Sequence, residues 1–171
     1  RHDDIAVVII DMAEAGLSLL HSLRGQVGGA AEYILVCDRE APDLQELLAR
    51  VVASGGKSAA MEVASNSLTS GRVSGILFDV AVFTNLTQDH LDVHGTMENY
   101  RDAKGMLFRE WADASRAAGK HFTAVINIDD EYGPYYANGT HAQRLLTYSP
   151  SGKNRADIVA VKQDISLGEL M

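Results

Sequence analysis

The sequence predicts an α/β fold in which helices cover a mostly parallel, doubly wound sheet. Short apolar runs rich in β-branched residues alternate with longer segments of helical spacing. The apolar runs contain almost no polar residue, which is typical of strands buried on both faces of a parallel sheet. The chain has 171 residues, of which 46% are hydrophobic, enough for one domain with its own core.

The order of these segments predicts where each element lies. Strands are expected at residues 5–10, 33–37, 58–63, 78–84 and 122–128. Helices are expected at residues 12–24, 42–54 and 97–117. Pro42 suits the first turn of the second helix, and Gly55 suits the position that ends it. Residues 129–139 are rich in turn formers, and short strands at 145–148, 157–161 and 164–167 predict a small β extension.

The composition argues against several classes of partner. The net charge is −8 and no long basic stretch is present, so neither nucleic acid nor an anionic membrane is expected to bind. Cys37 is the only cysteine, which excludes an internal disulfide framework and a multi-cysteine zinc site. No apolar run approaches the roughly 18 residues needed to span a bilayer, and no signal peptide is visible. A cytoplasmic location is expected, or a plastid if the source is a plant or alga.

The loop after the strand at 78–84 carries the densest group of reactive side chains. Asp89, His90, Asp92 and His94 are potential metal ligands within six residues. Carboxylates suit magnesium, whereas imidazoles suit zinc, iron or nickel. The spacing alone leaves a metal site and a solvated polar loop both open.

Lys104 lies on the apolar stripe of the predicted helix at 97–117. Thr96 can cap this helix, and the stripe consists of Tyr100, Lys104, Leu107, Phe108 and Trp111. Either the lysine stem lies at the edge of the core and its ammonium reaches water, or the amine is desolvated and its pKa is lowered. A neutral amine can react with carbon dioxide to give a carbamate, an anion able to hold magnesium.

Other polar residues stand at or near predicted strand ends, where open α/β sheets carry ligands. Glu62 ends the third strand and is either a structural ion pair or a metal ligand, because a lone buried charge is costly. Asn127 ends the fifth strand and is followed by Asp129 and Asp130, so a ligand site and a polar turn are equally consistent. Arg72 lies in a loop, where an arginine is usually solvated.

Two segments resemble the central domain of the Mur ligases, and within that family the UDP-N-acetylmuramoyl-tripeptide synthetases. They are MEVASNSLTSGRVSGILFDVAVFTNLTQDHLDVHGTMENYRDAKGMLF at 61–108 and VINIDDEYG at 125–133. Weaker similarity covers residues 42–55 and 156–168. The resemblance implies the P-loop-NTPase-like fold of that domain and a role in peptidoglycan synthesis.

The resemblance also implies a reaction with its cofactors and substrates. The family uses ATP and magnesium to join an amino acid, here diaminopimelate or lysine, to UDP-MurNAc-L-alanyl-D-glutamate through an acyl phosphate. By match to the family, Glu62 and His90 are magnesium ligands and Lys104 is a carbamylated lysine, and these three form the catalytic set. Asn127 and Asp130 match nucleotide-binding positions, and Ser65 and Arg72 match positions that contact the UDP-sugar peptide.

The chain also departs from the family pattern. The glycine-rich phosphate loop is absent, and residues 1–40 do not resemble the family. Residues 62–66 read Glu-Val-Ala-Ser-Asn in place of Glu-Val-Ser-Ser-His, and only a remnant of Thr-Thr-Pro stands at 39–42. The flanking UDP-binding and amino-acid-binding domains are expected to be missing, so the chain is expected to be inactive alone. The alternatives are a non-catalytic remnant or scaffold, and a metal-dependent hydrolase built on His90 and His94.

Overall fold

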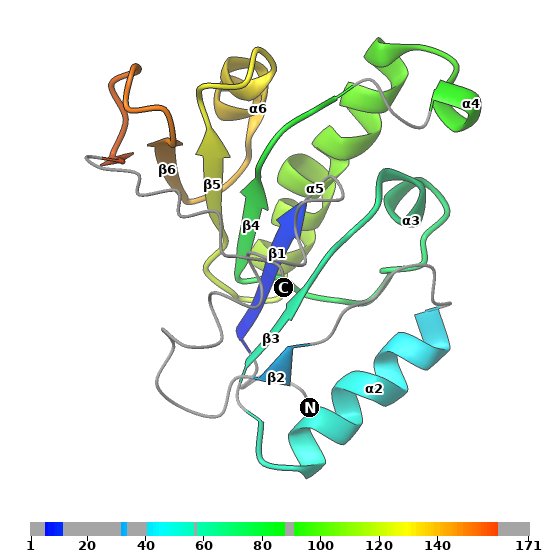
Figure 1. Ribbon diagram of the computed structural model, residues 1–171. Coiled ribbons are helices and arrows are strands. Elements are labelled where there is room, and N and C mark those ends of the chain that lie inside the picture. Colours follow the sequence, from blue (N-terminus) through cyan, green and yellow to red (C-terminus); the bar gives the residue numbers. More distant parts are fainter. Residues whose placement is uncertain (1–5, 12–31, 34–40, 57, 88–90, 161–171) are drawn as a thin grey trace, which may run out of the picture.

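A computed structural model describes residues 6–11, 32–33, 41–56, 58–87 and 91–160. Within them, seven strands form one sheet in the order β2-β3-β1-β4-β5-β6-β7, and every neighbouring pair is parallel (Figure 1). The strands are β1 (Ala6–Asp11), β2 (Glu32–Tyr33), β3 (Ser58–Met61), β4 (Val80–Phe83), β5 (Thr123–Asn127), β6 (Arg144–Ser149) and β7 (Ile158–Val159). The predicted parallel α/β fold is therefore confirmed.

The helices of the described segments connect these strands. They are α2 (Ala41–Ala53), α3 (Ser65–Thr69), α4 (Leu91–His94), α5 (Met97–Ala117) and α6 (Gly133–Gly139). α2, α5 and α6 each lead to the next strand in the same direction across the sheet. Because parallel crossovers are right-handed, these three helices lie on one face of the sheet. The segment that joins β1 to β2 is outside the described residues.

Burial along the strands agrees with the position of these three helices. Alternate residues of β3, β4 and β5 are almost fully buried, namely Ala59, Met61, Ala81, Phe83, Ala124 and Ile126. The intervening residues of the same strands, such as Val80, Val82 and Val125, are only half-buried. Successive side chains of a strand point to opposite faces, so the buried set is the face beneath the helices. These buried strand residues form the main core together with Phe78, Leu107 and Phe108.

Helix α5 follows its sequence signals closely. Thr96 is extended at the N-cap, and its hydroxyl accepts the backbone N–H of Asn99 at 3.2 Å. The helix ends at Ala117, and Gly119 follows with φ of 85°, a left-handed conformation that favours glycine. Figure 1 shows α5 running the length of the sheet, so its first turns lie near the strand arrowheads and its last turns near the opposite end.

Three features differ from the sequence prediction. The strands expected as a separate β extension instead join the main sheet, because β6 pairs in parallel with β5 and β7 with β6. Helix α6 lies in the stretch expected to be turns; Pro134 suits its first turn, and a Cβ at Gly133 would overlap the carbonyl oxygen of Asn127. The short helices α3 and α4 were not expected either. The expected helix at 12–24 and strand at 164–167 fall outside the described residues.

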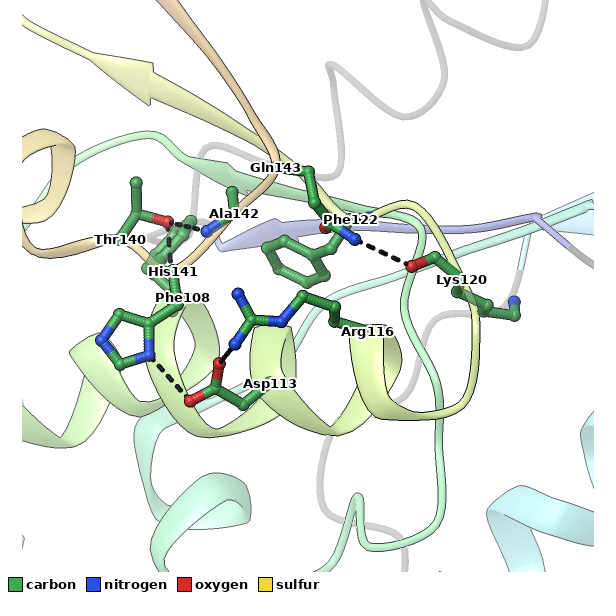
Figure 2. Close-up of polar contacts among 9 residues, drawn as sticks. All are labelled: Phe108, Asp113, Arg116, Lys120, Phe122, Thr140, His141, Ala142 and Gln143. Carbon is green, nitrogen blue, oxygen red and sulfur yellow. Dashed lines mark hydrogen bonds and ion pairs between the residues drawn. The ribbon is translucent and has the colours of Figure 1, made fainter.

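The connection from α6 to β6 is fastened to the C-terminal half of α5 (Figure 2). The Thr140 hydroxyl donates to the carbonyl of Phe108 at 3.2 Å, and His141 Nδ1 lies 2.8 Å from Asp113 Oδ2. Gln143 accepts the N–H of Phe122 and donates to the carbonyl of Lys120. These contacts fix the end of the sheet where the strands begin.

Among the described residues, no helix is both long and apolar enough to cross a bilayer.

Candidate functional site at the carboxyl end of the sheet

All strands of the sheet are parallel, so β3, β4 and β5 end on the same side, here called the carboxyl end of the sheet. Glu62 directly follows β3, and Asn127 is the last residue of β5. The chain beyond β4 leads to α4 and to the first turn of α5 at this same end (Figure 1). His90 lies outside the described residues, so its convergence with Glu62 remains a prediction.

Lys104 is buried in the described structure. Only 5% of the residue is exposed, and its Nζ lies 5.1 Å from the centroid of the Tyr100 ring. The ring and the amine are four residues apart on α5, which brings them to the same side of the helix. The burial of the residue favours the alternative of a desolvated amine. A buried amine needs a partner or a change of chemical state, because burial of an isolated charge is costly.

A hydrogen-bonded and stacked pair of side chains adjoins Lys104. Ser65 Oγ and His94 Nε2 are 2.7 Å apart, although 29 residues separate them in the sequence. Ser65 is 3% exposed. The His94 ring stacks on the Tyr100 ring, with centroids 5.0 Å apart and an interplanar angle of 19°. A continuous set of contacts thus runs from Ser65 to Lys104.

Glu62 and Arg72 are both half-buried. Glu62 stands between β3 and α3, where its carboxylate is at the carboxyl end of the sheet. Arg72 follows α3 in a turn, and its N–H donates to the carbonyl of Ser67 at 3.0 Å. Gly71 precedes it with φ of 76°, which directs the chain out of α3. Glu62 thus lies at the carboxyl end of the sheet, and Arg72 lies beyond the C-terminus of α3.

Asn127 and Asp130 connect the segment after β5 to the segment after β4. Asn127 Nδ2 donates to the carbonyl of Thr84 at 2.6 Å, and its Oδ1 accepts the N–H of Asp129 at 3.0 Å. Asp130 accepts the N–H of Leu86 at 3.1 Å and that of Tyr132 at 2.9 Å. The two predicted nucleotide-binding residues thus set the shape of this end of the sheet. The Asn127 amide keeps a second N–H and a second lone pair for a ligand.

Asp129 fixes the loop that follows β6. Its carboxylate accepts hydrogen bonds from Ser149 Oγ, the Ser151 N–H and Asn154 Nδ2, each at 2.7 Å. Partial desolvation raises the pKa of Asp129, but the hydrogen bonds from Ser151, Ser149 and Asn154 outweigh it and hold the pKa well below its usual range. Asp129 therefore orders the β6–β7 loop as a carboxylate.

Tyr148, on β6, crosses to β4 at the same end. Its hydroxyl donates to the carbonyl of Phe83 at 3.2 Å. Burial, together with the charges of Asp130 and Asp129, raises the pKa of Tyr148 to about 12. The hydroxyl consequently keeps its proton at neutral pH and remains a donor.

In the described part of the chain, two buried side-chain oxygens at the carboxyl end of the sheet have no hydrogen-bond partner: Asn66 Oδ1, on α3, and Asn85 Oδ1, beyond β4. Leaving a buried acceptor unpaired costs on the order of 1–3 kcal/mol. Such an oxygen is suited to meet a donor or a cation of a bound ligand.

The residues present fit a magnesium ion that is held together with phosphates. In the described part of the chain, no three His, Cys, Asp or Glu side chains gather as a metal cluster. Magnesium in nucleotide sites commonly needs only one or two protein ligands, since waters and phosphate oxygens supply the rest. Glu62 at the carboxyl end of the sheet, with orphaned amide oxygens on the same side, meets that requirement.

An open groove of about 550 Å³ adjoins His94, between α3, α4 and α5. Its lining is mixed, with Val93, Met106, Asn99, Asp102 and Arg109 among its residues. His94 therefore stands at the boundary between this groove and the buried Ser65 hydroxyl.

The parallel sheet and its polar carboxyl end define an α/β domain of the kind that binds ligands beyond its strand ends. The family model for the Mur ligase middle domain matches residues 9–169. The chain therefore belongs to the Mur ligase family, as its central domain, and the resemblance seen in the sequence is confirmed.

Several similar curated proteins carry the name UDP-N-acetylmuramoyl-L-alanyl-D-glutamate--2,6-diaminopimelate ligase. The protein of Synechococcus elongatus is 45% identical over 84% of this chain and 26% of its own length. That of Corynebacterium efficiens is 46% identical over 89% of this chain and 28% of its own length. The chain thus spans about a quarter of the length of these relatives. None of them supports the hydrolase alternative.

A solved structure of a ligase of the same name superposes on the chain with a TM-score of 0.73 and 28% sequence identity. The match covers 95% of this chain and 35% of the solved one. The parallel α/β fold is thus the fold of the Mur ligase central domain.

Sequence reasoning did not find the Ser65–His94 contact or the role of Tyr100. His94 was considered as a metal ligand, but its Nε2 meets the serine hydroxyl. The available signal was topological: Ser65 follows β3 and His94 follows β4, and the carboxyl ends of these two parallel strands lie on the same side of the sheet, with β1 between them. Side-chain pairing between them depends on the path of α3 and α4, which the sequence pattern did not predict.

Proposed function

We propose that this domain is the ATP-using central part of a ligase that adds diaminopimelate to UDP-MurNAc-L-alanyl-D-glutamate during peptidoglycan synthesis. The names of the relatives favour diaminopimelate over lysine as the amino acid. The observation that carries the proposal is Lys104, an almost fully buried lysine at the carboxyl end of a Mur ligase sheet.

The proposed reaction has two steps. The glutamate carboxylate of the acceptor attacks the γ-phosphorus of ATP, which gives an acyl phosphate and ADP. The amine of diaminopimelate then attacks the acyl carbon, loses a proton and displaces inorganic phosphate, leaving an amide. Bound magnesium would offset the repulsion between phosphate and carboxylate oxygens.

We assign the site residues expected from the sequence to the following parts of this reaction. Lys104, as a carbamate, and Glu62 and His90 would hold magnesium. Asn127 and Asp130 would shape and contact the nucleotide site, where they already fix the backbone around the ends of β4 and β5. Ser65 and Arg72 would contact the acceptor.

The direct test is phosphate release by the complete gene product that carries this domain. The assay contains ATP, magnesium, UDP-MurNAc-L-alanyl-D-glutamate and either diaminopimelate or lysine. Turnover with diaminopimelate on the order of 1 per second or faster is expected. Turnover only with lysine would change the substrate, and no phosphate release with either amino acid would overturn the proposal.

A second candidate, the non-catalytic remnant, rests on the absence of a phosphate loop in the sequence. Positioning of the β- and γ-phosphates supplies most of the catalysis in phosphoryl transfer, and this depends on backbone N–H groups and a lysine. We expect the 171-residue chain alone to show no ligase activity. Binding of a non-hydrolysable ATP analogue by the complete gene product would separate a ligase, which binds it, from a remnant, which does not.

A further inference from the structure

We propose that His94 is a positioning residue that acts on both sides of the site, on Ser65 through its hydrogen bond and on Lys104 through the Tyr100 ring. The inference rests on the proposed function, because it assumes that Lys104 is carbamylated and that Ser65 meets the acceptor. It adds a residue and a mechanism that the family match does not assign.

The contacts of His94 leave its ring little freedom. Nε2 is held 2.7 Å from Ser65 Oγ, and the ring face is stacked on Tyr100 at 5.0 Å. Ser65 and Tyr100 are themselves 3% and 5% exposed, so neither partner can move aside without disturbing the core. A displacement of either Ser65 or Tyr100 would therefore move the imidazole and, through it, the other residue.

The backbone of His94 is fixed independently of its side chain. Asn99 Nδ2 donates to the His94 carbonyl at 2.9 Å. Gly95 follows with φ of 76°, a left-handed turn that leads from α4 to the Thr96 cap of α5. Substitution of the imidazole should therefore remove its contacts without releasing the loop.

Tyr100 is the link to the lysine. Its ring contacts both the His94 ring and, at 5.1 Å from the centroid, Lys104 Nζ. A flexible four-carbon stem such as that of Lys104 is held in one orientation only by its surroundings. A shift of the Tyr100 ring would consequently misplace the Lys104 nitrogen, and misplacement by about 1 Å can cost 100-fold in rate.

The two contacts of His94 can be tested separately with two variants. His94→Phe keeps an aromatic ring for the stack on Tyr100 but cannot bond to Ser65. His94→Asn keeps a polar group for Ser65 but has no ring for the stack. If His94 is only structural, the two variants should differ from the unsubstituted protein in the same properties. If His94 positions both partners, His94→Phe should lose the function of Ser65 and His94→Asn the function of Lys104.

The first readout is carbamylation of Lys104, measured by carbon-13 NMR of the protein in labelled bicarbonate. His94→Phe should keep the carbamate signal, and His94→Asn and Tyr100→Leu should reduce it several-fold. Lys104→Met identifies the signal, because it removes the amine. His141→Ala is the matched control, since it removes a histidine from the opposite end of the sheet.

The second readout is steady-state kinetics of the complete gene product. His94→Phe should mainly raise KM for the UDP-linked dipeptide, roughly 10-fold, as for a lost hydrogen bond to a partner of the substrate. His94→Asn should mainly lower kcat. Circular dichroism and urea unfolding of each variant identify any that fails to fold, and the remaining variant then carries the test.

The outcomes separate the inference from the proposed function. No carbamate signal and no ligase activity in the unsubstituted protein would overturn the proposed function. A carbamate signal that is equal in unsubstituted protein, His94→Asn and Tyr100→Leu would overturn the role of His94 and leave the ligase proposal standing. Equal loss of kcat in His94→Phe and His94→Asn, with KM unchanged, would also overturn it.

Discussion

The two ends of the sheet hold similar side chains in opposite settings. At the amino end, where the strands begin, Lys120 Nζ lies 2.7 Å from Asp79 and donates to the Leu77 carbonyl at 3.2 Å. At the carboxyl end, Lys104 is 5% exposed and lies against the Tyr100 ring. Lys120 thus lies in a partly exposed ion pair, whereas Lys104 is almost fully buried and its Nζ lies over an aromatic ring.

The histidines show the same contrast. His141 pairs with Asp113 at 2.8 Å, and the two side chains are 47% and 43% exposed. Asp113 also pairs with Arg116 at 2.7 Å (Figure 2). His94 instead pairs with a serine that is 3% exposed and stacks on a ring that is 5% exposed. Exposed ion pairs contribute little to the free energy of unfolding, because water and salt screen them. We therefore expect the His141 pair only to hold its loop in place, whereas the buried contacts of His94 can affect the position of reactive groups.

The largest effect is expected from Lys104. In the complete gene product, Lys104→Met keeps an unbranched stem in the core but removes the amine, and ligase activity should fall roughly 100-fold or more, as for loss of a preorganised electrostatic group. In Lys104→Ala, which leaves space beside the Tyr100 ring, short carboxylates such as formate should restore part of the activity by replacing the carbamate. Lys120→Met is the control and should retain full activity. Similar activities in the two methionine variants would remove the contrast between the ends of the sheet.

Ser115 tests whether a buried polar group away from the carboxyl end affects stability without affecting activity. It is 0% exposed on α5, and its hydroxyl accepts the N–H of Phe78 at 2.8 Å. Ser115→Ala would leave that N–H buried and unpaired and should lower the free energy of unfolding by about 1–3 kcal/mol, with activity per folded molecule unchanged. Urea unfolding measures the loss, and the exposed Ser74→Ala is its control. A stability equal to that of the control would show that the buried N–H finds another partner.

Asp129 should make stability pH-dependent on the acid side. Its pKa in the folded protein lies below the unfolded value of about 3.9, so the unfolded chain binds more protons in that window and stability falls as pH falls. The contribution is complete above about pH 4 and is lost as pH falls towards the folded pKa. Urea unfolding at pH 6, 5, 4 and 3 should show a shallower acid decline for Asp129→Asn than for the unsubstituted protein. Parallel declines would mean that other carboxylates control acid unfolding.

The smallest effect is expected from His141. Its partner Asp113 keeps Arg116, and the pair is exposed, so His141→Ala should change the free energy of unfolding by less than about 1 kcal/mol and leave ligase activity unchanged. Thermal unfolding and phosphate release measure the two properties. A loss of activity comparable to that of His94→Asn would show that the amino end of the sheet also contributes to the site.

The sequence by itself determined the parallel α/β fold, the course of α5 and the place of Lys104 on its apolar stripe. Helix α5 begins and ends where Thr96 and Gly119 predict, because capping and left-handed glycine are local interactions that depend on adjacent residues. The apolar stripe likewise fixes which face of the helix meets the sheet, but only the structure showed that Lys104 on this stripe is almost fully buried. The family motifs at 61–108 and 125–133 determined the expected reaction, an ATP-dependent ligation.

Only the tertiary structure decided how the polar residues pair. Ser65 meets His94, and Asn127 meets Thr84, across 29 and 43 residues of sequence. These pairs depend on strand order and on the path of the short helices α3 and α4, neither of which leaves a periodic signal in the chain. The same holds for β6 and β7, since β6 pairs with the open edge of β5 and β7 with the open edge of β6. Local pattern determines elements and faces, and long-range packing determines partners, because a partner is a property of two segments and no single segment encodes it.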